Sequence, residues 1–150
     1  MSDIVIRPAL QVERSCLEAL QWRASLANSG DRDSLLAHPD AIALPAEQIA
    51  GGHVFVAQRD DTIVGFAAVL ARPDGDAELD ALFVEPSLWQ RGVGRLLVEH
   101  CAGVAHGRAS RILHVVGNLH AERFYAACGF RTTGAVETRF GAGLAMQREL

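Results

Sequence analysis

Lysine is absent from this chain of 150 residues, whose 14 basic side chains are all arginine. Its absence excludes Schiff-base chemistry on a lysine, and it excludes a P-loop, whose Gly-Lys-Ser/Thr sequence grips nucleotide phosphates. The formal net charge is −4 and no basic block occurs, so we expect no nucleic-acid partner held through phosphate contacts. No run approaches the roughly 18 apolar residues of a membrane span, so we expect no membrane partner.

Cysteine is also scarce, with only Cys16, Cys101 and Cys128. An odd number without paired spacing favours a reducing compartment over a disulfide framework. The segment Met1–Arg7 lacks the basic region and apolar stretch of a secretory signal, so we expect a cytoplasmic protein. The length and the apolar content of 49% predict a single domain over residues 1–150.

The six histidines show no paired metal-ligand spacing, so no metal site is expected. His114 lies in an apolar run, and we expect it to be a core histidine rather than a base. Cys101 and Cys128 lie on the apolar faces of predicted helices, where they would act as small hydrophobic side chains.

The most informative stretch is Leu82–Leu97, which reads LFVEPSLWQRGVGRLL and predicts a strand, a tight loop and a helix start. The first N–H groups of a helix have no partner within it, and glycine lets a ligand approach them closely. The pattern therefore predicts a site for a phosphate or pyrophosphate. A dinucleotide fingerprint is excluded, because its third glycine is replaced by Leu97. The alternative is a glycine-rich turn that leads into an ordinary helix.

The rest of the sequence alternates between strand-like and helix-like segments. Two-residue alternation bounded by turn residues predicts strands at residues 4–7, 53–58, 62–71, 77–84, 111–116, 130–139 and 144–150. Helical spacing predicts helices at residues 11–28, more weakly at 34–50, from Val93 to Gly107, and before Gly129. Residues 28–34 and 141–143 are expected to be a loop and a turn. This order predicts a layered α/β fold with helices on both faces of a sheet.

A second motif, NLHAERFYAACGF, follows at residues 118–130. Together the two stretches resemble the GNAT acyltransferase superfamily. The first is similar to its Gln/Arg-x-x-Gly-x-Gly/Ala loop, here Trp89–Gly94, and the second to its Asn-x-x-Ala-x-x-Phe-Tyr and Gly-Phe pattern. Trp89 departs from the usual Gln or Arg, with little expected consequence, since the family grips its ligand mainly by backbone N–H groups. The resemblance covers essentially the whole chain, is strongest over residues 64–130 and weakest over 11–52.

The resemblance implies the GNAT fold, with a mixed central sheet of about six to seven strands and about four helices. It also implies acetyl-coenzyme A as co-substrate. By this resemblance, the backbone of Leu82, Phe83 and Val84 would form hydrogen bonds with the pantetheine arm and would provide an N–H donor to the oxyanion. The pyrophosphate would be wrapped by Arg91, Gly92, Val93, Gly94 and Arg95.

Two residues of the second motif have family roles and ordinary alternatives. Asn118 matches the residue that bonds the cofactor arm, and it is equally natural as a helix N-cap. Tyr125, the only tyrosine, matches the family's cofactor-contacting proton donor to the departing thiolate. Tyr125 also lies on an apolar stripe, so the alternative is a packed core aromatic.

The general base has two candidates. Glu78 and Asp80 alternate with Leu79 and Ala81, so both carboxylates point to one side of their strand. Glu78 aligns best with the general-base glutamate of some family members, whereas Asp80 is nearer the expected thioester. We prefer Glu78, and a water relay is the remaining possibility.

The expected function is that of an N-acetyltransferase that moves the acetyl group of acetyl-CoA to a primary amine of a small molecule, by direct attack in a ternary complex. The alternatives are acetylation of a peptide or protein, and a non-catalytic sensor of acyl-CoA. We expect the acceptor pocket around the loop at 28–34, the second helical stretch and the turn at 139–143, with Trp22 and Arg23 as further candidates. Family members often dimerise, but the sequence locates no interface.

Overall fold

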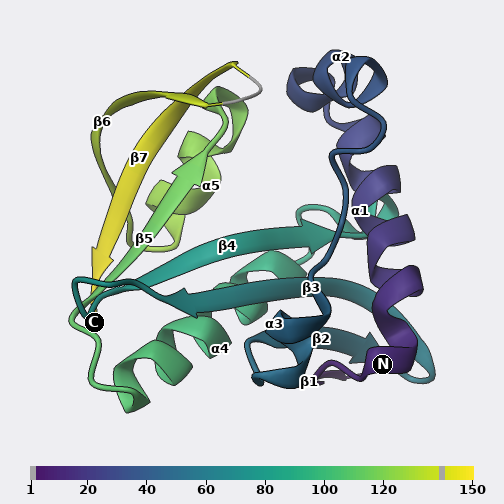
Figure 1. Ribbon diagram of the computed structural model, residues 1–150, viewed down its shortest axis with the longest axis horizontal. Coiled ribbons are helices and arrows are strands. Elements are labelled where there is room, and N and C mark those ends of the chain that lie inside the picture. Colours follow the sequence, from purple (N-terminus) through teal and green to yellow (C-terminus); the bar gives the residue numbers. More distant parts are fainter. Residues whose placement is uncertain (1–2, 139–140) are drawn as a thin grey trace. The chain divides into compact units, whose positions relative to one another are not determined.

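The computed structural model describes residues 3–138 and 141–150, and Figure 1 traces their helices and strands. Seven strands are hydrogen bonded in the order β1-β2-β3-β4-β5-β7-β6. By its internal contacts the chain divides into two compact units, Met1–Ala68 with Ala81–Val98 and Val69–Asp80 with Glu99–Leu150. Within the described ranges, no helix is both long enough and apolar enough to cross a bilayer.

The strands of the first unit are consecutive antiparallel neighbours. β1 (Ile4–Pro8) pairs with β2 (Val54–Arg59), and β2 pairs with residues 62–68 of β3 (Thr62–Ala71). The hairpin between β2 and β3 turns at Asp60, whose φ of 54° is left-handed, a conformation that aspartate tolerates better than most residues. The sequence therefore predicted both strands of this hairpin.

Three helices lie between β1 and β2 along the chain: α1 (Arg14–Ala27), α2 (Ser29–Ala37) and α3 (Ala46–Ala50). Leu17 and Leu20 of α1 are fully buried against side chains of β2 and β3 such as Phe66. Burial of a leucine or phenylalanine stabilises a fold by about 1.5–3 kcal/mol. The predicted apolar stripe of α1 is shorter than expected, because Val12 and Cys16 are exposed.

The prediction of a loop at residues 28–34 is wrong, because the helix α2 begins at Ser29. The Asn28 carbonyl accepts hydrogen bonds from the N–H groups of Asp31 and Arg32, so the chain turns directly into the next helix. Asp31 lies in the first turn, where a negative charge complements the helix dipole. The predicted second helical stretch is divided between α2 and α3, with non-helical residues around Pro39 and Pro45.

β4 (Ala77–Val84) and α4 (Val93–Gly107) contribute to both units. In the second unit, β4 pairs in parallel with β5 (Ile112–Gly117) at Ala77–Leu113 and Glu78–His114. β5 pairs antiparallel with β7 (Gly141–Glu149), which also pairs with β6 (Arg131–Thr138). The short helix α5 (Glu122–Ala127) links β5 to β6 along the chain.

One prediction at the C-terminal end needs correction. The turn expected at residues 141–143 is the start of β7, whose Gly141 pairs with Thr138. The β6 strand ends at Thr138 in the structure. Arg139, at the end of the predicted strand and of the expected acceptor turn, lies outside the described residues.

Candidate functional site

The loop that enters α4 contains two left-handed residues. Gln90 has a φ of 63° and Gly92 a φ of 88°. A non-glycine residue in this conformation costs about 1–2 kcal/mol, and such strained positions gather at ligand-binding sites. The Gly92 carbonyl accepts a 3.1 Å hydrogen bond from the N–H of Leu96, so Gly92 caps the helix start. The N–H groups of the first turn, beginning at Val93, are therefore those that lack intrahelical partners.

Core packing fixes the position of this helix start. Val93 and Leu97 of α4 are buried. A Cβ built on Gly65 of β3 would lie 3.0 Å from the Phe83 carbonyl oxygen, 3.2 Å from Leu97 Cδ1 and 3.4 Å from Val93 Cγ1. Gly65 therefore lets β3 approach both the end of β4 and the first turn of α4, a role that sequence reasoning missed.

The other predicted phosphate-loop residues leave the helix end accessible. Arg91 and Gly92 are exposed, Gly94 is half-buried and Arg95 is exposed. Positive side chains and a helix N-terminus both favour an anion. The sequence prediction of an anion site is consistent with this geometry.

The predicted pantetheine strand, Leu82, Phe83 and Val84, forms the half-buried end of β4. The Trp89 indole Nε1–H donates a 2.9 Å hydrogen bond to the Val84 carbonyl. This bond ties the residue that departs from the family pattern back to the strand that precedes the loop.

Arg23 is engaged in an ion pair. Its guanidinium donates two 2.8 Å hydrogen bonds to the two carboxylate oxygens of Glu85, directly after β4. The hydrogen bonds from Arg23 lower the pKa of the Glu85 carboxyl. Arg23 therefore secures the β4 end to α1, a role that differs from the pocket lining suggested by the sequence.

Tyr125 lies on α5 and is 8% exposed. Its ring forms edge contacts with Phe124 and Phe130, at centroid distances of 5.1 and 5.5 Å. A Cβ built on Gly117, at the end of β5, would lie 3.1 Å from the Tyr125 ring, so this glycine makes room for the ring. Burial raises the pKa of the Tyr125 phenol, which therefore stays protonated at neutral pH. The core reading and the proton-donor reading are compatible at this residue.

Asn118 has the N-cap role that was one of its two predicted readings. Its side-chain Oδ1 accepts a 2.9 Å hydrogen bond from the Ala121 N–H at the start of the short helical turn before α5. This cap helps to set the path of the chain between Gly117 and Tyr125.

The two candidate bases are confirmed to lie on one side of β4. Glu78 is half-buried and Asp80 is exposed, whereas the alternate residues Ala77 and Leu79 are buried. The carboxylates therefore belong to the solvent-facing side of this strand.

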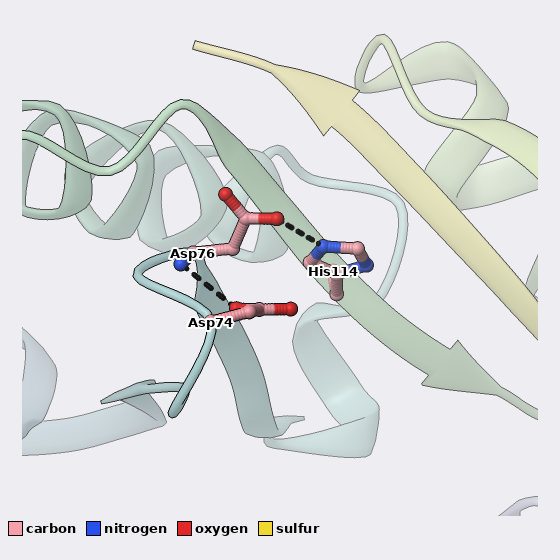
Figure 2. A group of neighbouring side chains, drawn as sticks. All are labelled: Asp74, Asp76 and His114. Carbon is pink, nitrogen blue, oxygen red and sulfur yellow. Dashed lines mark hydrogen bonds and ion pairs between the residues drawn. The ribbon is translucent and has the colours of Figure 1, made fainter.

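His114 is not the core histidine that its apolar neighbours suggested. It is the ladder partner of Glu78, and its Nε2 lies 2.9 Å from Asp76 Oδ2 (Figure 2). Its side chain is 21% exposed, whereas Leu113 and Val115 are buried. Two-residue alternation along β5 was the signal that could have placed His114 on the outer face.

Asp74 completes this group, and each of the three side chains presents a potential ligand atom within 4.8 Å of the others. Asp74 accepts a 2.9 Å hydrogen bond from the Asp76 N–H (Figure 2). It also accepts a 3.2 Å hydrogen bond from Arg72 Nε. The bond from the Asp76 N–H, with Arg72, lowers the pKa of the Asp74 carboxyl. Asp74 and Asp76 belong to the turn between β3 and β4, and His114 reaches this turn from β5.

Comparison with known proteins agrees with this architecture. A profile of the acetyltransferase (GNAT) family matches residues 17–130. The "Peptidyl-lysine N-acetyltransferase YjaB" of Salmonella typhimurium is 30% identical over 117 residues, which are 77% of this chain and 76% of that protein. The "Uncharacterized N-acetyltransferase Mb2688" of Mycobacterium bovis is 34% identical over 92 residues, 59% of each chain.

Solved structures share the fold along the whole chain. A GCN5-related N-acetyltransferase from Rhodopseudomonas palustris has a TM-score of 0.84 at 23% identity, covering 100% of this chain and 98% of that one. The PaiA N-acetyltransferase of Thermoplasma acidophilum, solved with coenzyme A, has a TM-score of 0.77 at 16% identity and covers 99% of both. The chain belongs to the GNAT family of acetyltransferases and has the α/β GNAT fold, with seven strands and five α-helices among its described residues.

Proposed function

We propose that this protein binds acetyl-CoA and transfers the acetyl group to a primary amine, by direct attack of the amine in a ternary complex. The observation that carries the proposal is the loop before α4, where left-handed Gln90 and Gly92 present an accessible helix start. Backbone N–H groups from Gly92 to Arg95 would hold the pyrophosphate, and Arg91 and Arg95 would add positive charge.

Tyr125 is the candidate acid. The attack forms a carbon–nitrogen bond and breaks the carbon–sulfur bond, so the sulfur departs with an electron pair. In our proposal the Tyr125 hydroxyl gives its proton to that thiolate, and Asn118 contacts the cofactor arm. Burial raises the pKa of the phenol, so the hydroxyl carries its proton when the thiolate departs.

The amine must also lose a proton. Glu78 is our first candidate to accept it and Asp80 the second, because both carboxylates lie on the accessible side of β4. The backbone at Leu82, Phe83 and Val84 would bond the pantetheine arm and stabilise the negative charge that develops on the carbonyl oxygen.

The acceptor class has two candidates. A small amine was expected from the short chain, and the net charge of −4 favours a cationic acceptor by electrostatic steering. A peptidyl lysine is favoured by the 30% identity to a relative that carries this activity in its name. Both acceptors present the same primary amine to the same chemistry.

Thermal unfolding with acetyl-CoA, free coenzyme A or NAD tests the binding step. A ligand at about 100 times its Kd adds about 2.7 kcal/mol of stability, which raises the Tm by several degrees. We expect this shift with both coenzyme A species and none with NAD. Equal melting temperatures at saturating acetyl-CoA would reject the pyrophosphate loop.

Thiol release from acetyl-CoA, with Nα-acetyl-lysine amide and spermidine as separate probes, tests the transfer and the acceptor class. Thiol release that depends on the added amine would support acetyl transfer. The relative rates with the two probes would show which acceptor class is preferred. A thermal shift without thiol release would instead favour the non-catalytic sensor.

A further inference from the structure

A histidine faces a row of carboxylates on the outer side of β4 and β5. Asp76 directly precedes β4, and Glu78 and Asp80 follow at two-residue spacing, so their side chains share one side of the strand. His114 is level with Glu78 in the ladder and contacts Asp76 at 2.9 Å, which places the imidazole on the same side. The opposite side belongs to the core, where four residues are 3% exposed or less: Ala77, Leu79, Leu113 and Val115.

The contact to Asp76 determines which ring nitrogen of His114 can take a proton. Because an ionised carboxylate only accepts hydrogen bonds, Nε2 must carry the proton that faces Asp76 Oδ2. In the neutral ring the lone pair then lies on Nδ1. A carboxylate in this position both orients an imidazole and stabilises the imidazolium that forms when the other nitrogen is protonated.

Several charged groups surround the ring. Asp74 and Asp76 lie beside it from the turn, and Glu78 is opposite it on β4. Arg72 is an opposing positive charge, but its guanidinium is paired with Asp74 at 3.0 Å. From β7, the ladder partner of His114 is the neutral Gln147.

We propose that His114, held by Asp76, acts through the base Glu78 as a positioning residue. It receives the proton that the acceptor amine loses, either from Glu78 directly or through a bridging water. This rests on the proposed acetyl transfer with Glu78 as its base. The proton leaves the amine nitrogen, passes to the Glu78 carboxylate and then to Nδ1 of His114, from which solvent removes it. The ring, whose side chain is 21% exposed, can be reached by water for this last step.

The chemical reason is a mismatch between a carboxylate and an amine. An ordinary glutamate titrates near ~4.3, well below neutral pH, whereas an imidazole titrates near ~6.5. General-base catalysis is most effective when the base titrates near the working pH. Because an imidazole is by type a stronger base than a carboxylate, a histidine beside the glutamate can take the proton onward.

The pH dependence of kcat/KM in the wild type and in His114→Gln tests the relay, with amine-dependent thiol release as the readout. We expect the variant to have at least a tenfold lower plateau and an acid limb displaced from that of the wild type. A purely structural role for His114 would change the thermal stability but not the acid limb. An unchanged limb would therefore overturn the proposal.

Two further variants control this test. Asp76→Asn leaves the ring but removes the carboxylate that sets its tautomer, so the plateau should fall with His114 present. His106→Gln removes an exposed histidine at the end of α4 and should match the wild type in limb and plateau. A drop in His106→Gln equal to that in His114→Gln would also overturn the relay.

A second measurement needs no turnover. The ¹⁵N chemical shifts of the His114 ring report its tautomer, and we expect protonation at Nε2 in the neutral wild type. A neutral ring protonated at Nδ1 would overturn the relay even if acetyl transfer is established. Loss of the coenzyme A thermal shift, by contrast, would reject the proposed function itself, so the two failures are distinguishable.

Discussion

At the scale of single residues, Tyr125 combines a core position with a candidate chemical role. Its ring packs edge-on against Phe124 and Phe130, and Gly117 provides the space that it occupies. The same burial that stabilises the ring raises the pKa of its hydroxyl, so the group that would protonate a thiolate remains a proton donor.

Replacing Tyr125 by phenylalanine should lower the turnover number and leave the affinity for coenzyme A nearly unchanged. We expect a decrease of about 10- to 100-fold, at the lower end for general acid catalysis, since a thiolate is already a good leaving group. The ring contacts are retained, so the Tm should change little. Turnover equal to the wild type would remove Tyr125 from the acid role.

The three cysteines should differ sharply in reactivity. Cys16 is exposed, whereas Cys101 and Cys128 are buried, and burial raises the pKa of the Cys101 thiol to about 12. Because the thiolate is the reactive form, a thiol reagent at pH 8 should modify only Cys16 in the native protein and all three in denaturant. Mass spectrometry of the labelled peptides measures this, and fast native labelling of Cys101 would contradict the burial.

At the scale of elements, the first turn of α4 is the element on which the proposed binding depends. Its backbone conformation requires a residue that tolerates a positive φ at Gly92, and the outward space there is open. The constraint is therefore backbone strain rather than steric contact.

Gly92→Ala should lower the free energy of unfolding by about 1–2 kcal/mol, the cost of a left-handed alanine, and should weaken coenzyme A binding. Gly103→Ala is the matched control, since Gly103 lies inside the same helix with nothing within 4 Å of the added Cβ. It should raise the free energy of unfolding by about 0.5–1 kcal/mol and leave binding unchanged. Urea unfolding and calorimetry measure both effects.

If both alanine variants lost affinity equally, the loop conformation would have no special role in binding. If both gained stability, the left-handed conformation of Gly92 would not be retained in solution. Only opposite signs agree with the structure.

At the scale of the whole molecule, stability in acid should reflect paired carboxylates. Hydrogen bonds from Arg23 lower the pKa of Glu85, and those from Arg7 lower the pKa of Glu13. A carboxyl whose pKa is lower in the folded state stabilises the fold above its ordinary pKa of about 4.3. That contribution is lost as the pH falls through the lowered folded value.

Glu85→Gln should therefore cost more stability at pH 7 than at pH 3. The expected loss at pH 7 is about 1 kcal/mol or less, as for other accessible ion pairs, although the two-bond geometry favours the upper end. Urea unfolding at the two pH values measures it, with the exposed Glu137→Gln as the control. A stability difference between wild type and Glu85→Gln that is larger at pH 3 than at pH 7 would contradict this prediction.

The sequence by itself determined most of the strands, the start and end of α4, and the family. The strand at Thr62–Ala71 and the helix at Val93–Gly107 lie where they were predicted, because alternation, helical spacing and flanking glycines are local signals. The candidate loop and Tyr125 were also found from short motifs, since their chemistry depends on residues close together in the chain.

Only the tertiary structure decided which faces are buried and which distant side chains meet. Leu96 has the spacing of a buried residue but is 46% exposed, because the width of the covered face depends on the elements packed against α4. The Arg23–Glu85 pair and the Asp76–His114 contact join residues 62 and 38 positions apart. No local pattern encodes such contacts, because they depend on the register of strands and on helix packing.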